Sequence, residues 1–414
     1  MKLFETSTPE VLTQKAKALY RQEREQHKIL NGWFLSREIA ADVDEKIGGI
    51  QPELRAAAEL SAVIEKLPLE ISENAILAGT QRDAFAASYA LINPAFQVET
   101  FRGYCDPLEV YDYATPTEEI PQERIDTMRS RAAQSPNVRA LSAVYQEFGE
   151  YTDEVAFFVE QVTGHMIPDF RPALKHGVRA LMEAIDRKLV NGGLREKQAE
   201  NLEAMKQSLS CAIRLAERYA DLAHSLQKTA RTQRKAELAL MEETLRRVPE
   251  FGARSLLEAM QSYVLLWQVM CLEQAPNPFA FSVGNADRIF EPYRAMEGLS
   301  REEAAALFKH FLVFYNIGER SWAISQNILI SGRDLDGNDL TNPMSYAILD
   351  AYYDMNLPQP ILSVKLHRNT PKKLYEEMGR FFFTPGCLTP SLFNDDSLFD
   401  TLREHGVEEG DLPE

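Results

Sequence analysis

Four cysteines carry the most reactive side chains of the sequence, and their spacing limits the chemistry they can do. They are Cys105, Cys211, Cys271 and Cys387. Paired thiols of the form Cys-x-x-Cys would indicate a metal site, and a dense cysteine framework would indicate a secreted disulfide scaffold. Neither pattern occurs, His-Glu-x-x-His is absent, and the seven histidines are far apart. We therefore expect free thiols, a reducing compartment and no metal site.

A group of carboxylates at residues 334–339 begins like a calcium-binding loop. Asp334, Asp336 and Asn338 occupy alternate positions, as in such loops. A calcium loop also needs glycine at its sixth position and glutamate at its twelfth. The sixth position here is Asp339 and the twelfth is Ser345. The pattern instead predicts a tight acidic turn after a strand at residues 327–331. Gly-x-Gly-x-x-Gly and phosphate-loop motifs are also absent.

Five short motifs, in a fixed order along the chain, resemble those of the glycyl radical enzymes, the pyruvate formate-lyase family. They lie at residues 164–170 (Gly-His-Met-Ile-Pro-Asp-Phe), 282–287 (Ser-Val-Gly-Asn-Ala-Asp), 327–346, 359–371 and 390–395. The chain departs from the family at Asn285, where arginine is usual, and at Arg288, where glutamine is common. This chain has Phe279 and Ala280 where the diol dehydratases that it resembles have a His-Ser pair. This departure disfavours a glycerol- or propanediol-type dehydratase.

The resemblance implies a helix-wrapped barrel of two facing five-stranded halves. In such enzymes a glycine near the C-terminus stores a radical, which an S-adenosylmethionine-dependent activating enzyme installs. A cysteine on a central loop then abstracts hydrogen from the substrate inside a closed cavity. The radical motif Arg-Val-x-Gly-Tyr is absent from these 414 residues. We expect one truncated domain over residues 1–414, the N-terminal half of a lyase or dehydratase for a small polar substrate, inactive alone. The alternative is a non-catalytic half-barrel fragment that pairs with another chain.

The resemblance suggests no catalytic residue in this chain but three candidate substrate contacts. They are His165, Ser282 and Asp287. A histidine can hydrogen-bond a hydroxyl or a carboxylate, but His165 could equally be a buried residue before a helix that starts near Pro168. Asp287 is better explained as the N-cap of the following helix. Cys387 precedes the Phe-Asn-Asp motif, whereas the family's cysteine follows it, so we expect a buried residue at a strand end.

Length and charge narrow the class of protein. The 414 residues include 45 Lys plus Arg and 62 Asp plus Glu, which gives a net charge of −17. This acidic balance argues against a nucleic-acid partner. No apolar stretch approaches the ~20 residues that a membrane span needs, and the N-terminus lacks an apolar signal core. We therefore expect a cytoplasmic protein without a membrane partner.

The spacing of apolar residues along the chain predicts the helices and strands that must position these residues. Helices are predicted from Pro9 to about Asn31-Gly32, at residues 52–67 and through most of residues 171–272. Residues 75–113 should be irregular and residues 116–136 a surface excursion. Strands are predicted at residues 279–284, 327–331, 361–367 and possibly 388–393, each followed by a helix. This alternation indicates an α/β fold. A half-barrel would leave strand edges open, so we also expect a homo-oligomer.

Overall fold

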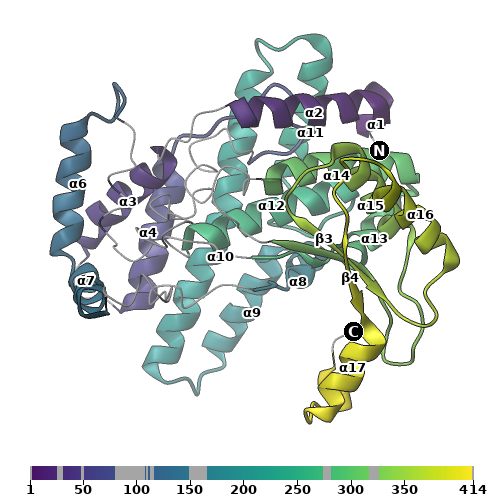
Figure 1. Cartoon of the computed structure of the whole chain (residues 1–414). Helices are drawn as coiled ribbons and strands as arrows, with labels where there is room; N and C mark the ends of the chain where they lie inside the picture. The colour runs from purple at the N-terminus through teal and green to yellow at the C-terminus, as the bar shows by residue number, and fades with distance from the viewer. Residues whose placement is uncertain are drawn as a thin grey trace.

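A computed structural model describes residues 2–25, 31–47, 51–79, 108, 111, 116–148, 166–273, 281–316 and 326–412. Helices make up the first part of the chain and alternate with strands in the last part (Figure 1). The first part contains α1 (Lys2–Thr6), α2 (Pro9–Glu25), α3 (Asn31–Asp44), α4 (Pro52–Lys66), α6 (Gln122–Gln134), α7 (Pro136–Phe148), α8 (Arg171–His176), α9 (Val178–Val190), α10 (Glu196–Leu226), α11 (Thr232–Leu245) and α12 (Leu256–Glu273). The helical prediction for residues 52–67 and 171–272 is confirmed.

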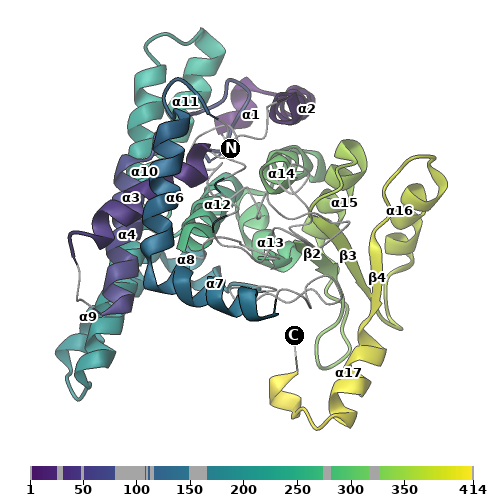
Figure 2. The same cartoon turned by 60° about the vertical axis from the view of Figure 1, so that its left-hand side comes forward.

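Four parallel strands form one sheet in the order β1-β2-β3-β4. They are β1 (Gly284–Asn285), β2 (Asn327–Ser331), β3 (Ile361–Leu366) and β4 (Ser391–Asn394). The helices of this part are α13 (Ala286–Glu297), α14 (Arg301–Tyr315), α15 (Pro343–Met355), α16 (Lys372–Phe383) and α17 (Asp395–Glu404). Figure 2 shows β2, β3 and β4 beside one another, with α15 and α16 close to them. The predicted α/β class is confirmed.

The two faces of the sheet differ in chemistry because successive side chains of a strand point to opposite sides. Ile328, Ile330 and Val364 are fully buried, and they share the face on which the connecting helices pack. The opposite face carries Asn285, Leu329, Ser363 and Ser391, which the strand register places in one row across the sheet. Parallel sheets normally bury two apolar faces. A row with three polar residues among its four members is therefore the feature to explain.

A cluster of aromatic side chains belongs to the same core as the apolar face of the sheet, the face of Ile328, Ile330 and Val364. Tyr263 and Trp267 of α12 pack edge-on against Phe311 and Tyr315 of α14, with ring centroids 5.0–5.8 Å apart for the Tyr263–Phe311 and Trp267–Tyr315 pairs. Phe290 of α13 completes the cluster, 5.2 Å from Phe311. Such edge-to-face pairs add to the free energy of burial. The strands and the long helices thus share one hydrophobic core.

Two predictions for the N-terminal half are wrong. Asn31-Gly32 does not end a helix but begins α3, because Phe34 lies in a small second core. Residues 116–136 are not a surface excursion throughout, since α6 buries Ile125 and Met128 in that same core. The charged residues of α6 hid this short apolar contact. Residues 75–79 are irregular, as expected, whereas residues 80–107 lie outside the described part of the chain.

The strand boundaries shift by a few residues. β2 has the predicted bounds, β3 ends one residue early, and β4 runs from Ser391 rather than residue 388. β3 ends there because the backbone N–H of His367 donates to Thr370 Oγ1 at 2.8 Å instead of joining the ladder. β1 begins only at Gly284, and residues 279–280 are outside the described ranges. Within those ranges, no helix has the length and apolar character that crossing a bilayer requires.

Candidate active-site face

Ser282 connects the polar face to the segment that contains the first family-like motif. Its backbone N–H donates to the carbonyl oxygen of Met166 at 2.9 Å, and its Oγ accepts from the backbone N–H of Asn327 at 2.9 Å. Asn327 Oδ1 in turn accepts from the Ser363 hydroxyl at 3.1 Å. Ile167 lies so close to Gly284 that a Cβ there would be 2.7 Å from its Cγ2. The chain at residues 166–167 therefore covers the outer edge of β1.

His165 itself lies outside the described residues, so its predicted substrate contact stays a prediction. The residue that follows it, Met166, is bonded to Ser282, which brings two of the motifs together in space. The helix expected near Pro168 starts three residues later, at Arg171 in α8. Phe170 is the N-cap residue of α8, and the Asp169 Oδ1 before it accepts from the backbone N–H of Arg171 at 3.1 Å.

Asp287 is completely buried at the start of α13 and does not serve as its N-cap. Asn285 holds the N-cap position, so that expectation is wrong. The Asp287 carboxylate instead accepts from the backbone N–H of Ser331 at 2.7 Å and from the Ser345 hydroxyl at 2.5 Å. Burial raises the pKa of this carboxyl, and the two hydrogen bonds oppose that rise. Asp287 thus joins the ends of β1 and β2 to the start of α15.

A buried ion pair lies at the carboxyl end of the same face. Lys365 Nζ is 3.2 Å from Asp395 Oδ2, and both side chains are almost inaccessible to solvent. The same Asp395 oxygen accepts from the backbone N–H of Arg333 at 3.1 Å. Burial lowers the pKa of Lys365, and the Asp395 charge acts in the opposite direction. Lys365, which lies on this face two residues beyond Ser363, is therefore already compensated within the protein.

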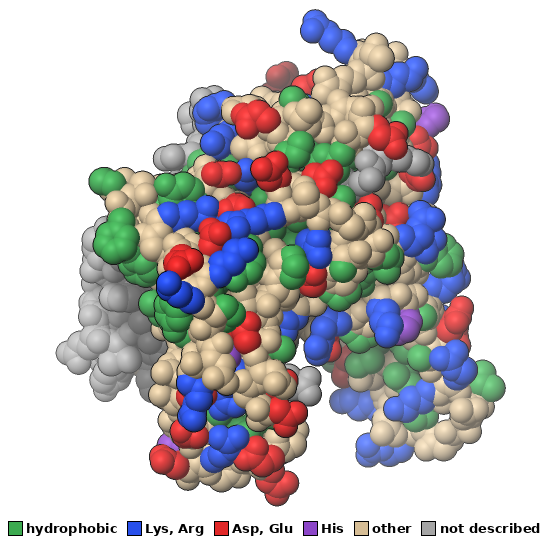
Figure 3. Space-filling model, turned by 90° about the vertical axis from the view of Figure 1, so that its right-hand side faces the viewer, with side chains coloured by type: hydrophobic (Ala, Val, Ile, Leu, Met, Phe, Trp, Pro, Cys, Tyr) green, Lys and Arg blue, Asp and Glu red, His purple; other side chains and the backbone are tan. Residues whose placement is uncertain are grey.

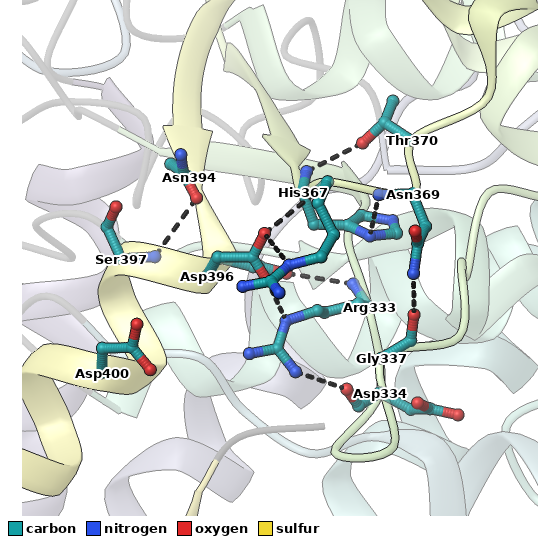
Figure 4. A network of polar contacts seen from close by, with 12 residues as sticks. Arg333, Asp334, Gly337, His367, Asn369, Thr370, Asn394, Asp396, Ser397 and Asp400 are labelled. Carbon is teal, nitrogen blue, oxygen red and sulfur yellow. Dashed lines mark hydrogen bonds and ion pairs between the residues drawn. The ribbon is translucent and has the colours of Figure 1, made fainter.

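A second group of charges lies at the carboxyl ends of β2, β3 and β4 (Figure 4). Arg333 Nε is 2.8 Å from Asp396 Oδ1, and His367 Nε2 is 3.0 Å from Asp339 Oδ1. The backbone N–H of Arg368 donates to Asp396 Oδ2 at 2.8 Å. Burial raises the pKa of the Asp396 carboxyl, but the hydrogen bonds from Arg368 outweigh burial and lower it overall. These contacts hold the loop after β2 against the ends of β3 and β4.

The acidic loop after β2 is a turn, as predicted, and has no geometry of a calcium site. The Asp334 carboxylate accepts from the backbone and the side chain of Asn338, at 2.8 and 2.9 Å. Asn369 Nδ2 donates to the carbonyl of Gly337 at 3.1 Å, which ties the turn to the end of β3. Across the part of the chain that the structure describes, no group of His, Cys, Asp and Glu could hold a metal ion.

Two cysteine side chains, those of Cys211 and Cys387, are among the described residues. Cys211 is buried in α10, and Cys105 lies outside the described residues. Cys271 lies in α12, in agreement with the helical prediction. Cys387 is only half-buried and lies in the turn between α16 and β4, so the expected buried strand end is wrong. Burial raises the pKa of the Cys387 thiol, which disfavours the reactive thiolate.

Sequence reasoning missed Lys365, Asp395 and Arg333 as members of the site. One signal was present: a lysine within the apolar strand 361–366 must be paired when both faces of the strand are buried. The partner could not be named, because Asp395 and Asp396 are adjacent and each follows β4. The structure places Ser282 just before β1, Asp287 just after it in α13, and Lys365 in β3 of the same sheet.

Comparisons with known proteins match this architecture. The model of the pyruvate formate lyase-like family matches residues 7–414. The trans-4-hydroxy-L-proline dehydratase of Clostridioides difficile is 26% identical over 253 residues, which are 56% of this chain and 31% of that protein. The isethionate sulfite-lyase of Bilophila wadsworthia is 27% identical over 267 residues, 58% of this chain and 31% of that protein.

Solved structures share the fold over a longer stretch. The glycerol-bound B12-independent glycerol dehydratase from Clostridium butyricum superposes with a TM-score of 0.77 at 20% identity, over 96% of this chain and 52% of that chain. A glycyl radical enzyme from Archaeoglobus fulgidus gives a TM-score of 0.74 at 20% identity, over 97% of this chain and 53% of that chain. The chain thus spans about a third of the curated relatives and half of the solved ones. It belongs to the pyruvate formate lyase-like family.

Proposed function

We propose that this chain forms one wall of the active site of a glycyl radical dehydratase or lyase that acts on a small polar substrate. The observation that carries the proposal is the row across one face of the parallel sheet in which Asn285, Ser363 and Ser391 are polar and Leu329 alone is apolar. The sheet is part of a ten-stranded barrel, and this face looks into its interior. The matched relatives include a dehydratase and a lyase of small polar molecules, which supports the reaction class.

The wall would bind and orient the substrate rather than react with it. Asn285, Asn327 and Ser363 offer amide and hydroxyl groups, and Lys365 is compensated by Asp395. Uncharged donors and acceptors suit a hydroxyl-bearing substrate. His165 and Ser282 would contribute from the β1 edge, and Asp287 would hold the wall together from behind. The thiyl cysteine and the radical glycine come from sequence outside these 414 residues, and the radical requires an S-adenosylmethionine-dependent activating enzyme.

The test is anaerobic activation followed by electron paramagnetic resonance. These 414 residues, treated with a radical S-adenosylmethionine activating enzyme, should give no glycyl-radical doublet and no turnover. The full catalytic protein, with a Gly-Cys loop and a radical glycine, should give both. A doublet on the 414-residue chain would refute the proposal that the radical glycine lies outside these 414 residues. A radical-bearing full protein that converts no small polar substrate would favour the alternative, a non-catalytic fold that pairs with another chain.

A further inference from the structure

We propose that Asn316, Gln326 and Gln359 form a buried site for ordered water, at the place where the end of α14 meets the amino ends of β2 and β3. The site lies outside the candidate active-site face, because Gln326 is two residues before Ile328 and their side chains point to the same side of the sheet. Ile328 belongs to the face on which the helices pack. The site is therefore independent of the proposed function.

Two hydrogen bonds bring the three residues together from separate parts of the chain. The backbone N–H of Ile361, the first residue of β3, donates to the carbonyl of Gln326 at 2.8 Å. Two residues before Ile361, the backbone N–H of Gln359 donates to Asn316 Oδ1 at 3.2 Å. Asn316 is the C-cap residue of α14. The amino ends of two neighbouring strands thus meet the end of one helix.

The amide side chains at this place are buried and are not paired with protein groups. Gln326 has no exposed surface, and Asn316 is 3% exposed. Among the residues that the structure describes, no group bonds to either side-chain polar atom of Gln326, to Asn316 Nδ2 or to Gln359 Oε1. A buried polar group without a hydrogen bond is costly, and native proteins satisfy most groups of this kind with ordered water.

Gln261 of α12 shows how this fold pairs another buried glutamine within the protein. It is 1% exposed. Its Oε1 accepts from the backbone N–H of Ala78 at 2.7 Å, and its Nε2 donates to the carbonyl of the same residue at 3.2 Å. Gln326 is buried to the same degree without such bonds to the described chain. The charged side chains on the face that carries α16 and α17 (Figure 3) are hydrated by bulk solvent, which does not reach Gln326.

The unmet groups specify a neutral ligand that both donates and accepts hydrogen bonds. Asn316 Nδ2 is a donor, because the Oδ1 of the same amide is held by the Gln359 N–H. Gln359 Oε1 is an acceptor, and the Gln326 amide supplies one donor and one acceptor in either orientation. A cation would leave the donors unmet, and an anion would leave the acceptors unmet. Water satisfies both, and it is small enough for a place whose neighbours in the sequence, Tyr315 and Ile328, have no exposed surface.

The position of the water gives it a structural role in the sheet. Gln326 precedes Asn327, whose backbone N–H donates to Ser282 Oγ at 2.9 Å and whose Oδ1 accepts from the Ser363 hydroxyl at 3.1 Å. Water bonded to Gln326 and to Asn316 fixes the start of β2 against the end of α14. It thereby holds the first residue of β2 in the position that these two hydrogen bonds require.

Thermal unfolding of the complete protein tests the site through the sign of one substitution. Gln326→Met keeps the length of the side chain and removes its amide. If water satisfies the amide, the variant loses those hydrogen bonds and its unfolding midpoint falls. If the amide has no partner, the variant removes two unmet buried groups, and the midpoint rises or stays unchanged. Gln261→Met, which loses two protein hydrogen bonds, is the matched control. We expect the fall for Gln326→Met to be at least about half as large as the fall for the control.

A crystal structure of the complete protein gives an independent readout, which also decides the question if the methionine variant does not fold. We expect ordered oxygen atoms within about 2.7–3.2 Å of the Gln326 amide and of Asn316 Nδ2. An unfolding midpoint of Gln326→Met that rises or stays unchanged would overturn the proposal. So would a structure with no ordered oxygen at this place, with a protein group bonded to the Gln326 amide, or with a larger organic molecule in contact with it.

Discussion

The Asp287 carboxylate and the Ser331 backbone N–H form a 2.7 Å hydrogen bond that fixes the last residue of β2 to the first turn of α13. Arg288, the next residue of that helix, binds the other peptide group of Ser331, because its Nη2 donates to the Ser331 carbonyl at 3.0 Å. Ser331 has a positive φ of 64°, a conformation that costs a non-glycine residue about 1–2 kcal/mol. Two adjacent side chains thus hold both peptide groups of one strained residue.

Replacing the strained residue should not harm the fold. Ser331→Gly removes the left-handed strain, and the Ser331 hydroxyl has no hydrogen-bond partner to lose among the residues that the structure describes. We expect the free energy of unfolding to stay equal or to rise by up to about 1 kcal/mol. Urea unfolding measures this change. Gly332→Ala is the contrasting variant, since its Cβ would lie 2.5 Å from Asp395 Oδ2, and it should destabilise by at least about 2 kcal/mol. Equal effects of both variants would contradict the geometry.

Removing the Asp287 carboxylate should be costly. Asp287→Ala leaves the Ser331 N–H and the Ser345 hydroxyl without their buried acceptor. Each unsatisfied group costs about 1–3 kcal/mol, so we expect the two together to lower the free energy of unfolding by roughly 2–6 kcal/mol. Asp287→Asn keeps one acceptor oxygen and should lose less than half as much. A stable alanine variant that loses only substrate affinity in the full protein would identify Asp287 as a substrate contact instead.

The sequence allowed the strands of the last third to be predicted from short apolar segments that are each followed by turn residues. Residues 362–366 alternate between apolar and polar, whereas residues 327–331 hold three consecutive apolar residues between Asn327 and Ser331, and the structure has both strands. β1 was placed too early because Phe281 and Val283 alternate with Ser282, which is typical of a strand. Only Gly284 and Asn285 join the ladder, while the Ser282 N–H is taken by Met166.

The site was less accessible to sequence reasoning. Lys365 and Asp395 are thirty residues apart in the sequence, and only the parallel order of β3 and β4 brings them together. Asp287 was assigned to a local cap because Asp near a helix start usually caps it. Its partners, Ser331 and Ser345, lie 44 and 58 residues away. Local patterns contain no information on such distant contacts.

The Lys365–Asp395 pair should behave as a coupled unit. Removing one partner leaves a buried charge unpaired, so Asp395→Ala and Lys365→Met should each destabilise by about 3–5 kcal/mol. The double variant should lose much less than the sum, because no uncompensated charge remains. Chemical unfolding of the four proteins measures the coupling. Arg403→Met, in an exposed ion pair of α17, is the control and should change stability by less than about 1 kcal/mol. Additive single effects would show that the pair is not coupled.

Cys387 should be dispensable for the fold. Its thiol makes one long hydrogen bond, 3.6 Å to the Leu388 carbonyl, and its half-buried side chain packs at the margin of the core. Cys387→Ala should therefore cost about 1 kcal/mol or less. Since burial raises the pKa of this thiol, its alkylation by iodoacetamide at pH 7.5 should be slower than that of an unfolded control. Complete loss of turnover in the full protein, with the fold intact, would make Cys387 the radical-bearing thiol.

The loss in the free energy of unfolding at acidic pH should contain a contribution from His310. This residue of α14 is buried against α2, where its Nε2 donates to the Leu12 carbonyl at 3.0 Å. Burial lowers the pKa of His310 to about 3, and the cations Lys15, Arg234 and Lys309 act in the same direction. The unfolded chain binds the proton near pH 6.5 and the folded chain only near pH 3, so this stability is present above pH 6.5 and is lost as the pH falls. At pH 4.5 the loss should be roughly 2–3 kcal/mol.

The variant His310→Gln tests this contribution, because it keeps a donor for the Leu12 carbonyl but does not titrate. Its free energy of unfolding, measured in urea at pH 7 and at pH 4.5, should fall less than that of the unaltered protein. Parallel losses in the two proteins would mean that His310 is accessible to protons in the folded state.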